Sequence, residues 1–376
     1  MLDWLWVLTV IPSLGFLIFV HELGHFLTAL KLGIKVEEFG FGYPPRILTL
    51  FHWRGVPVTL NWLPLGGFVR MAGEEGNFEV EGSLATAPPW KKIPVMAAGA
   101  VMNILTAIII FALIMGVAGQ PDAVGPVTIA EVADNSPAAQ AQLRPNDVIL
   151  ALNGQKVDSI SQLQGLIQDQ AGKEITLDVQ RTGTPEGTTT FNAKLTPRTR
   201  EQLGPNEGAV GVVLDVPADQ VVEVRYTNRL NPIEALIFGV NRTFTLFVEM
   251  LRGIGMLLGS FFGLADPSIR GGVAGPVGIA RMTGEVARTG GLISYLNLTA
   301  LISVNLALIN LLPFPALDGS RIVFALIEWV RRGKRVPPEK EAMVHALGMI
   351  ALLGLMLLIT FSDIRNIWIG RDAFGG

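Results

Sequence analysis

Two histidines four residues apart enclose an acidic residue in the sequence His21-Glu22-Leu23-Gly24-His25. On an α-helix, residues at positions i and i+4 lie one above the other on nearly the same face. Two imidazoles placed in this way can both reach one zinc ion at about 2.0–2.1 Å. The carboxylate of Glu22 is then next to the first ligand and can take a proton from a metal-bound water. The segment therefore predicts a metal centre that activates water.

A third protein ligand is expected, because a catalytic zinc generally has three and keeps its fourth position open. Of the other two histidines, His52 lies in a basic loop and His345 stands alone in a later apolar stretch. No acidic residue occurs from 286 to 317, and then comes Asn310-Leu-Leu-Pro-Phe-Pro-Ala-Leu-Asp318-Gly319. Its prolines break the helix, and freed backbone at membrane depth is tolerated only beside a buried cavity. We therefore expect Asp318 to be the third ligand; the alternative is a helix-end cap at the cytosolic face.

The composition excludes several classes of protein. Of the 376 residues, 16% are charged and 50% are hydrophobic, and the mean hydropathy is +0.45. The chain is therefore too apolar to be disordered or an ordinary water-soluble protein. It has no cysteine, which excludes thiol catalysis, disulfides and Cys-ligated zinc. A net charge of −3 gives no field that attracts nucleic acid, so no nucleic-acid partner is expected.

Membrane-spanning helices must position the motif. Crossing the hydrocarbon core takes about 20 mostly apolar residues. Four stretches meet that requirement: 4–30, 93–121, 289–317 and 343–362. A further apolar stretch, 233–264, is interrupted by four charged residues: Glu234, Arg242, Glu249 and Arg252. Because charges at the bilayer centre are costly, we expect that stretch to be an amphipathic helix in the membrane interface. The predicted fold is a polytopic α-helical membrane protein with about four transmembrane helices.

Basic residues beside the spans predict their orientation. They gather between the first and second spans and again between the third and fourth, and short basic loops stay in the cytosol. Both termini and the long middle segment then lie on the other side. His21 and Asp318 both come at the cytosolic ends of their spans. We therefore expect a multi-pass protein of the inner (plasma) membrane, with its metal centre in the membrane towards the cytosolic side.

The middle segment has the patterning of a small α+β domain. Strands are expected at 127–132, 147–152, 174–181 and 189–195, with a helix that starts at Ser159 and ends near 170. This order, with NSPAAQAQLRPNDVILALNGQKV at its centre, resembles an extracytoplasmic PDZ domain of the bacterial protease type over 125–196. PDZ domains bind an extended peptide as an added strand. The alternative is a PDZ-shaped spacer with no ligand.

The HExxH motif together with N-x-x-P-x-P-x-L-D-G resembles the site-2 protease family of intramembrane zinc metalloproteases. The resemblance covers nearly the whole chain and is strongest to the bacterial members that regulate sigma-E. It includes FGFGYPP (39–45), LPLGGFVRMAGE (63–74), AAGAVMNILTA (97–107) and GPVGIA (275–280). One difference is that enterobacterial relatives carry two PDZ modules, whereas this chain has room for one.

The resemblance implies a domain order and a role for each matching residue. The order is helices 1 and 2 with a membrane-associated β-hairpin loop (1–121), a PDZ domain (125–196), a linker with the interfacial helix (197–288), and helices 3 and 4 (289–376). His21, His25 and Asp318 would hold zinc, and Glu22 would be the general base. The residues that would position the substrate are Asn310, near the metal, and Gly40, Phe41 and Gly42, in a β-hairpin that pairs with an unwound substrate strand.

The implied function is zinc-dependent hydrolysis of peptide bonds within transmembrane segments of substrate proteins, such as anti-sigma factors or remnant signal peptides. The implied partners are these substrates, a peptide ligand of the PDZ domain and the lipid bilayer. The alternative is a non-catalytic membrane scaffold that binds peptides through its PDZ domain; the presence of Glu22 favours the enzyme. A metal transporter is disfavoured, because the spans 93–121 and 343–362 contain almost no ionisable residue.

Overall fold

The computed structural model describes residues 6, 8–73, 81–184, 187–203, 208–217, 220–264, 266 and 275–368. The chain divides into two compact units. The first consists of residues 1–117 and 230–376, and the second consists of residues 118–229. The second unit is larger than the predicted domain at 125–196, because strands on both sides of that range belong to it.

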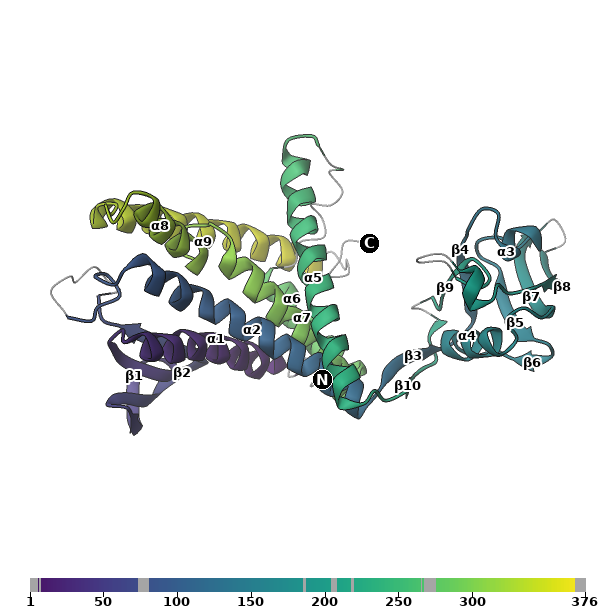
Figure 1. Cartoon of the computed structure of the whole chain (residues 1–376), viewed down its shortest axis with the longest axis horizontal. Helices are drawn as coiled ribbons and strands as arrows, with labels where there is room; N and C mark the ends of the chain where they lie inside the picture. Colours follow the sequence, from purple (N-terminus) through teal and green to yellow (C-terminus); the bar gives the residue numbers. More distant parts are fainter. Residues whose placement is uncertain are drawn as a thin grey trace. The chain divides into compact units, whose positions relative to one another are not determined.

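The first unit is a helical assembly with a β-hairpin. Its helices are α1 (Val10–Leu32), α2 (Pro89–Val117), α5 (Pro232–Phe261), α6 (Pro276–Thr289), α7 (Gly291–Leu311), α8 (Asp318–Val330) and α9 (Pro338–Trp368), as Figure 1 shows. The central element is α2, which packs against α1, α5, α7 and α8. Its contact with α1 depends on Gly24, where a Cβ atom would collide with the carbonyl oxygen of Ala98.

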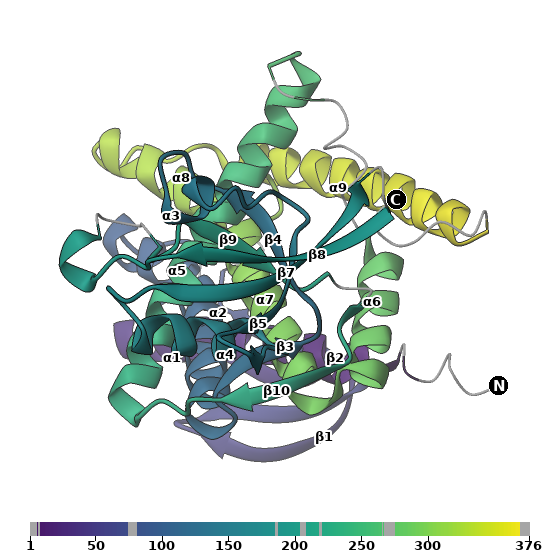
Figure 2. The same cartoon turned by 90° about the vertical axis from the view of Figure 1, so that its right-hand side faces the viewer.

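Five helices of the described residues are long and apolar enough to cross a membrane, one more than the four predicted. They are Val10–Leu32, Pro89–Val117, Pro232–Ser260, Gly291–Leu311 and Glu339–Arg365. The additional candidate is α5, the stretch predicted to lie in the interface. In both views α5 runs across α2 and α7 rather than alongside them (Figures 1 and 2). A helix that crosses its neighbours does not share their direction through a bilayer, so an interfacial position for α5 stays a prediction.

The hairpin consists of β1 (Val36–Trp53) and β2 (Val56–Met71), which pair antiparallel. Both strands are long and fold back, so the pairing forms four rows. Residues 36–43 pair with 63–71 on one side, and residues 39–41 pair with 58–60 on the other. Residues 46–53 pair with 56–61. The row 36–43 is therefore interior, and 63–71 is an edge of the sheet. Aromatic rings fasten the sheet to α1: Phe39 stacks on Phe26, and Phe41 on Phe19, both at 4.5 Å between centroids.

The second unit is α+β, with a hydrophobic core of its own. Its elements are β3 (Gln120–Val124), β4 (Val127–Val132), α3 (Pro137–Gln140), β5 (Val148–Leu152), β6 (Gln155–Lys156), α4 (Ile160–Asp169), β7 (Ile175–Thr184), β8 (Gly187–Leu195), β9 (Val212–Asp215) and β10 (Glu223–Thr227). The main sheet has the order β8-β7-β5-β4-β9, with β6 beside β5, whereas β3 and β10 form a separate two-stranded sheet. The hydroxyl of Ser159 accepts a hydrogen bond from the backbone of Gln162 and so caps α4, as the sequence predicts.

Candidate metal centre

Three side chains from two distant parts of the chain come together between α1, α2 and α8. His21 and His25 lie on α1, and Asp318 is the first residue of α8. Asp318 Oδ2 lies 3.0 Å from His21 Nε2 and 3.2 Å from His25 Nε2, and the two Nε2 atoms are 3.1 Å apart. Ligands around a tetrahedral zinc at about 2.0 Å are themselves about 3.3 Å apart. The three atoms are therefore close to the spacing that a single zinc ion requires.

The surroundings of the three atoms also fit a metal site. Both imidazoles are buried, and α2 faces them with Gly99. A Cβ atom on Gly99 would come within 2.5 Å of Nε2 of both His21 and His25. The glycine therefore leaves open the space into which the ligand atoms point. Two nitrogens and one carboxylate oxygen are a donor set typical of catalytic zinc.

A main-chain carbonyl fixes the orientation of His25. Its Nδ1 lies 2.7 Å from the carbonyl oxygen of Val95 on α2. A carbonyl can only accept, so Nδ1 carries the hydrogen and Nε2 of the neutral ring presents a lone pair. A hydrogen bond from the second ring nitrogen is the usual way in which proteins orient a metal-binding histidine. His25 is thus held in the tautomer that can ligate a metal through Nε2.

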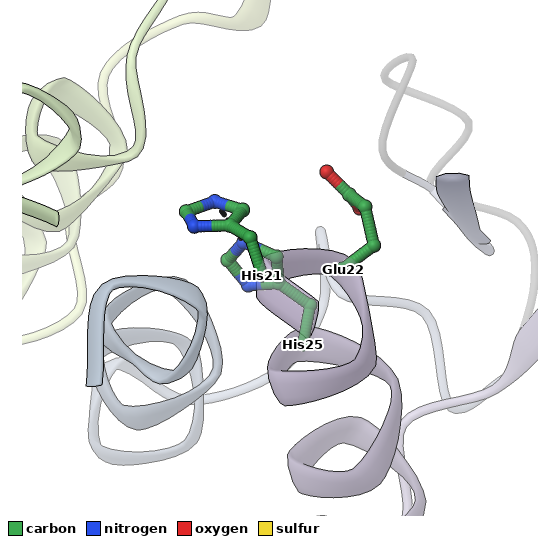
Figure 3. A group of neighbouring side chains, drawn as sticks. All are labelled: His21, Glu22 and His25. Carbon is green, nitrogen blue, oxygen red and sulfur yellow. Dashed lines mark hydrogen bonds between the residues drawn. The ribbon is translucent and has the colours of Figure 1, made fainter. Parts of the chain in front are cut away.

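Glu22 stands beside the two histidines but points to another side of α1 (Figure 3). An oxygen of its carboxylate lies within 4.8 Å of a ring nitrogen of each histidine. Oε2 of Glu22 accepts a hydrogen bond of 3.3 Å from the main-chain N–H of Val69 in β2. Asp318 Oδ2, at 3.0 and 3.2 Å from the two Nε2 atoms, has the spacing that a third ligand requires. Glu22 is left between the ligand cluster and an edge of the β-sheet.

The break before Asp318 is held in shape by α9. Ala316 has a φ of +75°, a backbone conformation uncommon for a residue other than glycine, and its N–H donates to His345 Nδ1 at 3.1 Å. Gly348 lies so close to Pro315 that a Cβ atom there would collide with it. His345, isolated in the sequence, thus contacts the loop that carries Asp318. Asn310 lies in the last turn of α7, and within the described residues it makes no hydrogen bond to His21, His25 or Asp318.

The glycines of the FGFG segment shape the sheet rather than offer an edge. A Cβ atom on Gly40 would collide with Phe68 and Asn61. Gly42 has a φ of +76°, and its carbonyl accepts from Asn61 Nδ2 at 3.1 Å. Residues 39–41 are paired on both sides. In this structure the backbone of residues 39–41 already faces neighbouring rows. The pairing of Gly40-Phe41-Gly42 with a substrate strand stays a prediction.

Glu38 in the hairpin is paired with two arginines of the same hairpin, Arg46 and Arg70. Burial of Glu38 acts to raise its pKa, but hydrogen bonds from Arg46 and Thr59 and the charges of Arg46 and Arg70 outweigh it and hold the pKa below the ordinary value.

Burial, and secondarily the negative charge of Glu22, raise the pKa of Tyr43. Tyr43 is thus near enough to Glu22 to sense its charge. Sequence reasoning missed Tyr43, although it directly follows the FGFG segment.

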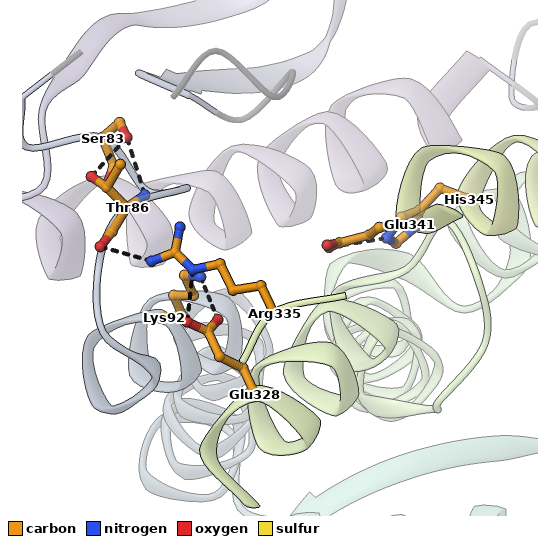
Figure 4. A network of polar contacts seen from close by, with 7 residues as sticks. All are labelled: Ser83, Thr86, Lys92, Glu328, Arg335, Glu341 and His345. Carbon is orange, nitrogen blue, oxygen red and sulfur yellow. Dashed lines mark hydrogen bonds and ion pairs between the residues drawn. The ribbon is translucent and has the colours of Figure 1, made fainter. Parts of the chain in front are cut away.

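A second polar group, the Glu328 cluster, joins the other end of α8 to α2 (Figure 4). It consists of Glu328, Lys92, Arg335 and Thr86. Oε2 of Glu328 lies 2.7 Å from Lys92 Nζ, and Oε1 accepts from Arg335 Nε at 2.8 Å. Arg335 also donates to the carbonyl of Thr86 at 3.0 Å. Only 7% of the Glu328 side chain and 15% of the Lys92 side chain are exposed, so this ion pair is buried, whereas 35% of the Arg335 side chain is exposed.

Comparison with known proteins identifies the family. The model of peptidase family M50 matches residues 9–355. A putative zinc metalloprotease of Agrobacterium fabrum is 31% identical, over 96% of both chains. The regulator of sigma-W protease RasP of Bacillus subtilis is 27% identical over 96% of this chain and 99% of its own, and the chloroplastic membrane metalloprotease ARASP of Arabidopsis thaliana is 33% identical over 94% and 78%.

A solved PDZ domain of an SdrC-like protein from Listeria monocytogenes covers 24% of this chain and 87% of its own length, at 20% identity and a TM-score of 0.19. That score is too low to support an argument, so the PDZ assignment stays a prediction. The family match over most of the chain, and relatives named zinc metalloproteases along nearly its full length, carry more weight. The chain belongs to peptidase family M50, the site-2 proteases, and is a multi-pass membrane zinc metalloendopeptidase.

Proposed function

We propose that this protein cleaves peptide bonds within transmembrane segments of other membrane proteins, with His21, His25 and Asp318 as zinc ligands and Glu22 as general base. The observation that carries the proposal is the convergence of three ligand atoms, all within 3.2 Å of one another, from α1 and α8. The carboxylate of Glu22 lies beside them, on the side of the β-sheet.

The residues of the site divide the chemistry among them. When bound, zinc would act as a Lewis acid that polarises the scissile carbonyl and lowers the pKa of the attacking water. Glu22 accepts one proton of the attacking water on its carboxylate. It then transfers that proton to the amide nitrogen, which leaves as a free amine when the C–N bond breaks. The balance is one water consumed and one new carboxyl and one new amino terminus formed.

The edge of β2 is the proposed place for the substrate backbone. A helical peptide bond has its groups hydrogen-bonded and shielded, so the substrate must be extended before attack. Residues 63–71 form an edge row, and the N–H of Val69 already turns out of the sheet towards Glu22. An extended segment added there would lie beside Glu22. Asn310 is proposed to position the substrate from the end of α7.

The sequence and the names of relatives support a topology and a substrate class. We propose that the basic loops, and with them the metal centre, face the cytosol, and that residues 125–196 form an extracytoplasmic PDZ domain with a peptide ligand. One relative is named as a regulator of sigma-W. Membrane-bound anti-sigma factors, or remnant signal peptides, are therefore the proposed substrates.

Co-expression with tagged candidate membrane proteins tests the proposal. Wild type should convert a substrate into a shorter tagged fragment, whereas Glu22→Gln should leave it intact and co-purify with it. Glu174→Gln, an exposed change in the second unit, is the matched control and should cleave as wild type does. Equal cleavage by Glu22→Gln and wild type would rule out the proposed mechanism. Co-purification of the substrate with no cleavage by any variant would favour the peptide-binding scaffold.

A further inference from the structure

Asn103 is a fully buried amide on α2 that lies against the metal centre. Its Nδ2 is 3.3 Å from His21 Nδ1, and its backbone carbonyl accepts a hydrogen bond of 2.8 Å from Ser303 on α7. Its Oδ1 has no hydrogen-bond partner within the described part of the chain. Buried polar atoms nearly always have a partner. An unpaired oxygen beside a metal-binding imidazole therefore needs an explanation.

The explanation lies in the two tautomers of His21. A neutral imidazole has one N–H and one lone pair. When Nδ2 of Asn103 donates to Nδ1, the hydrogen of His21 must be on Nε2, where it can donate to Asp318 Oδ2 at 3.0 Å. In that tautomer Nε2 has no lone pair for a metal. To ligate zinc through Nε2, His21 must carry its hydrogen on Nδ1, and a buried N–H there needs an acceptor.

A half-turn of the Asn103 amide provides that acceptor. The amide oxygen and nitrogen have nearly the same shape, and only their hydrogen-bonding partners distinguish them. After the half-turn, Oδ1 faces Nδ1 of His21 and accepts its hydrogen. We propose that Asn103 is the positioning residue of His21: its amide accepts from Nδ1 when His21 binds zinc, and donates to Nδ1 when it does not.

The two histidine ligands are thereby held in different ways. The carbonyl of Val95 can only accept, so His25 has a single tautomer. The amide of Asn103 can do either, so His21 keeps a buried partner both with and without metal. This inference rests on the proposed ligand roles of His21 and His25. It adds a residue that contacts neither metal nor substrate.

Two substitutions of similar size distinguish whether Asn103 acts as a hydrogen-bond acceptor or only fills space. Asn103→Leu keeps the volume but removes the acceptor, and should weaken zinc binding about 10- to 100-fold, the usual cost of losing such a partner. Asn103→Asp keeps an acceptor at the same place and should therefore not show that loss. The matched control is Thr106→Val on α2. Thr106 is buried, and its hydroxyl donates to the carbonyl oxygen of Met102 in the same helix.

Zinc affinity is measured by competition with a chelator on the purified full chain, and the visible spectrum of the Co²⁺-substituted protein reports the ligand geometry. The spectrum should change in Asn103→Leu but not in Thr106→Val. A folded Asn103→Leu protein with wild-type affinity and spectrum would overturn the inference. If that variant does not fold, Asn103→Asp decides, and tenfold weaker binding would overturn it. Zinc retained by His25→Ala would instead show that the ligand assignment itself is wrong.

Discussion

Two polar clusters hold the two ends of α8, and they are built in opposite ways. At the first residue of the helix, a single oxygen of Asp318 faces both His21 and His25. Near its last turn, each oxygen of Glu328 has a cationic partner of its own, Lys92 or Arg335. Both carboxylates are largely buried, with 20% and 7% of the side chain exposed.

The Asp318 cluster has the features of a site for a ligand, whereas the Glu328 cluster has those of a structural contact. Neutral imidazoles carry no charge that could compensate the Asp318 carboxylate, even where His21 Nε2 donates a hydrogen bond to it, whereas a bound cation would supply that charge. In the Glu328 cluster the charge of the carboxylate is compensated within the chain, because Lys92 and Arg335 each bind one of its oxygens. A buried charge with no compensation is costly, and a bound metal supplies that compensation. The clusters should therefore respond differently to metal removal and to mutation.

The largest effect is expected from the loss of a ligand. His21→Ala or Asp318→Ala should lose zinc and with it all measurable cleavage, because two remaining ligands do not hold a catalytic zinc tightly. Metal content of the purified protein, measured by atomic emission, checks this. Glu328→Gln, at the other end of α8, is the control and should keep about one zinc per chain. Stoichiometric zinc in a His21→Ala, His25→Ala double variant would contradict the site.

The general base should affect catalysis without affecting the metal. Glu22→Gln cannot accept a proton, and the loss of a general base typically lowers the rate about 10²- to 10⁴-fold. The measurement is the cleavage rate of a transmembrane substrate in detergent or liposomes, together with the zinc content. We expect the zinc content to stay at the wild-type level. A Glu22→Gln protein without zinc would make Glu22 a ligand instead of a base.

The Glu328 cluster should dominate stability. Glu328→Leu leaves Lys92 and Arg335 without their shared acceptor, and breaking a buried pair in this way typically costs about 3–5 kcal/mol. Thermal unfolding of the zinc-loaded protein measures the loss. Lys92→Met combined with Glu328→Leu should recover part of it, because one buried charge no longer lacks a partner. If the loss of stability in the double variant equals the sum of the losses in the two single variants, Lys92 and Glu328 are not energetically coupled.

Metal removal should loosen one end of α8 only. The chain has no cysteine, so single cysteines report accessibility without background. Ser320 and Ala325 are both buried on α8, towards the Asp318 end and the Glu328 end respectively. A chelator should increase thiol labelling of Ser320→Cys several-fold more than that of Ala325→Cys, because only the first end has lost its cation. Equal increases would show that the two clusters are not independent.

The smallest effect is expected at Glu38, a buried carboxylate that, like Glu328, has two cationic partners, here Arg46 and Arg70. Its folded-state pKa is lowered, because hydrogen bonds and charges from Arg46 and Arg70 outweigh its burial. Its stabilising contribution is therefore full above the ordinary Glu pKa of about 4.3 and is lost as the pH falls through the lower folded value. Unfolding measured across the acid range should be less pH-dependent in Glu38→Gln than in wild type. An equal pH dependence of stability in Glu38→Gln and wild type would exclude Glu38 as the source of that dependence.

Local patterns in the sequence were sufficient for much of this molecule. The spacing of His21 and His25 placed both rings on one face of α1, because the helical repeat is a property of consecutive residues. The apolar stretches predicted α1, α2, α7 and α9, and the alternation from Val127 to Val132 predicted β4 with its observed bounds. Asp318 could be singled out because its stretch offered no other acidic residue.

Contacts between distant residues decided the rest. The sequence could not show that Asn103 would face His21, that Val95 would orient His25, or that His345 would hold the loop before Asp318, since these partners are 29 to 82 residues apart. Nor could it show that the FGFG segment would be an interior row of its sheet, because register depends on how β2 folds back along β1. Periodicity fixes which face of an element a residue occupies, whereas only tertiary packing decides what that face meets.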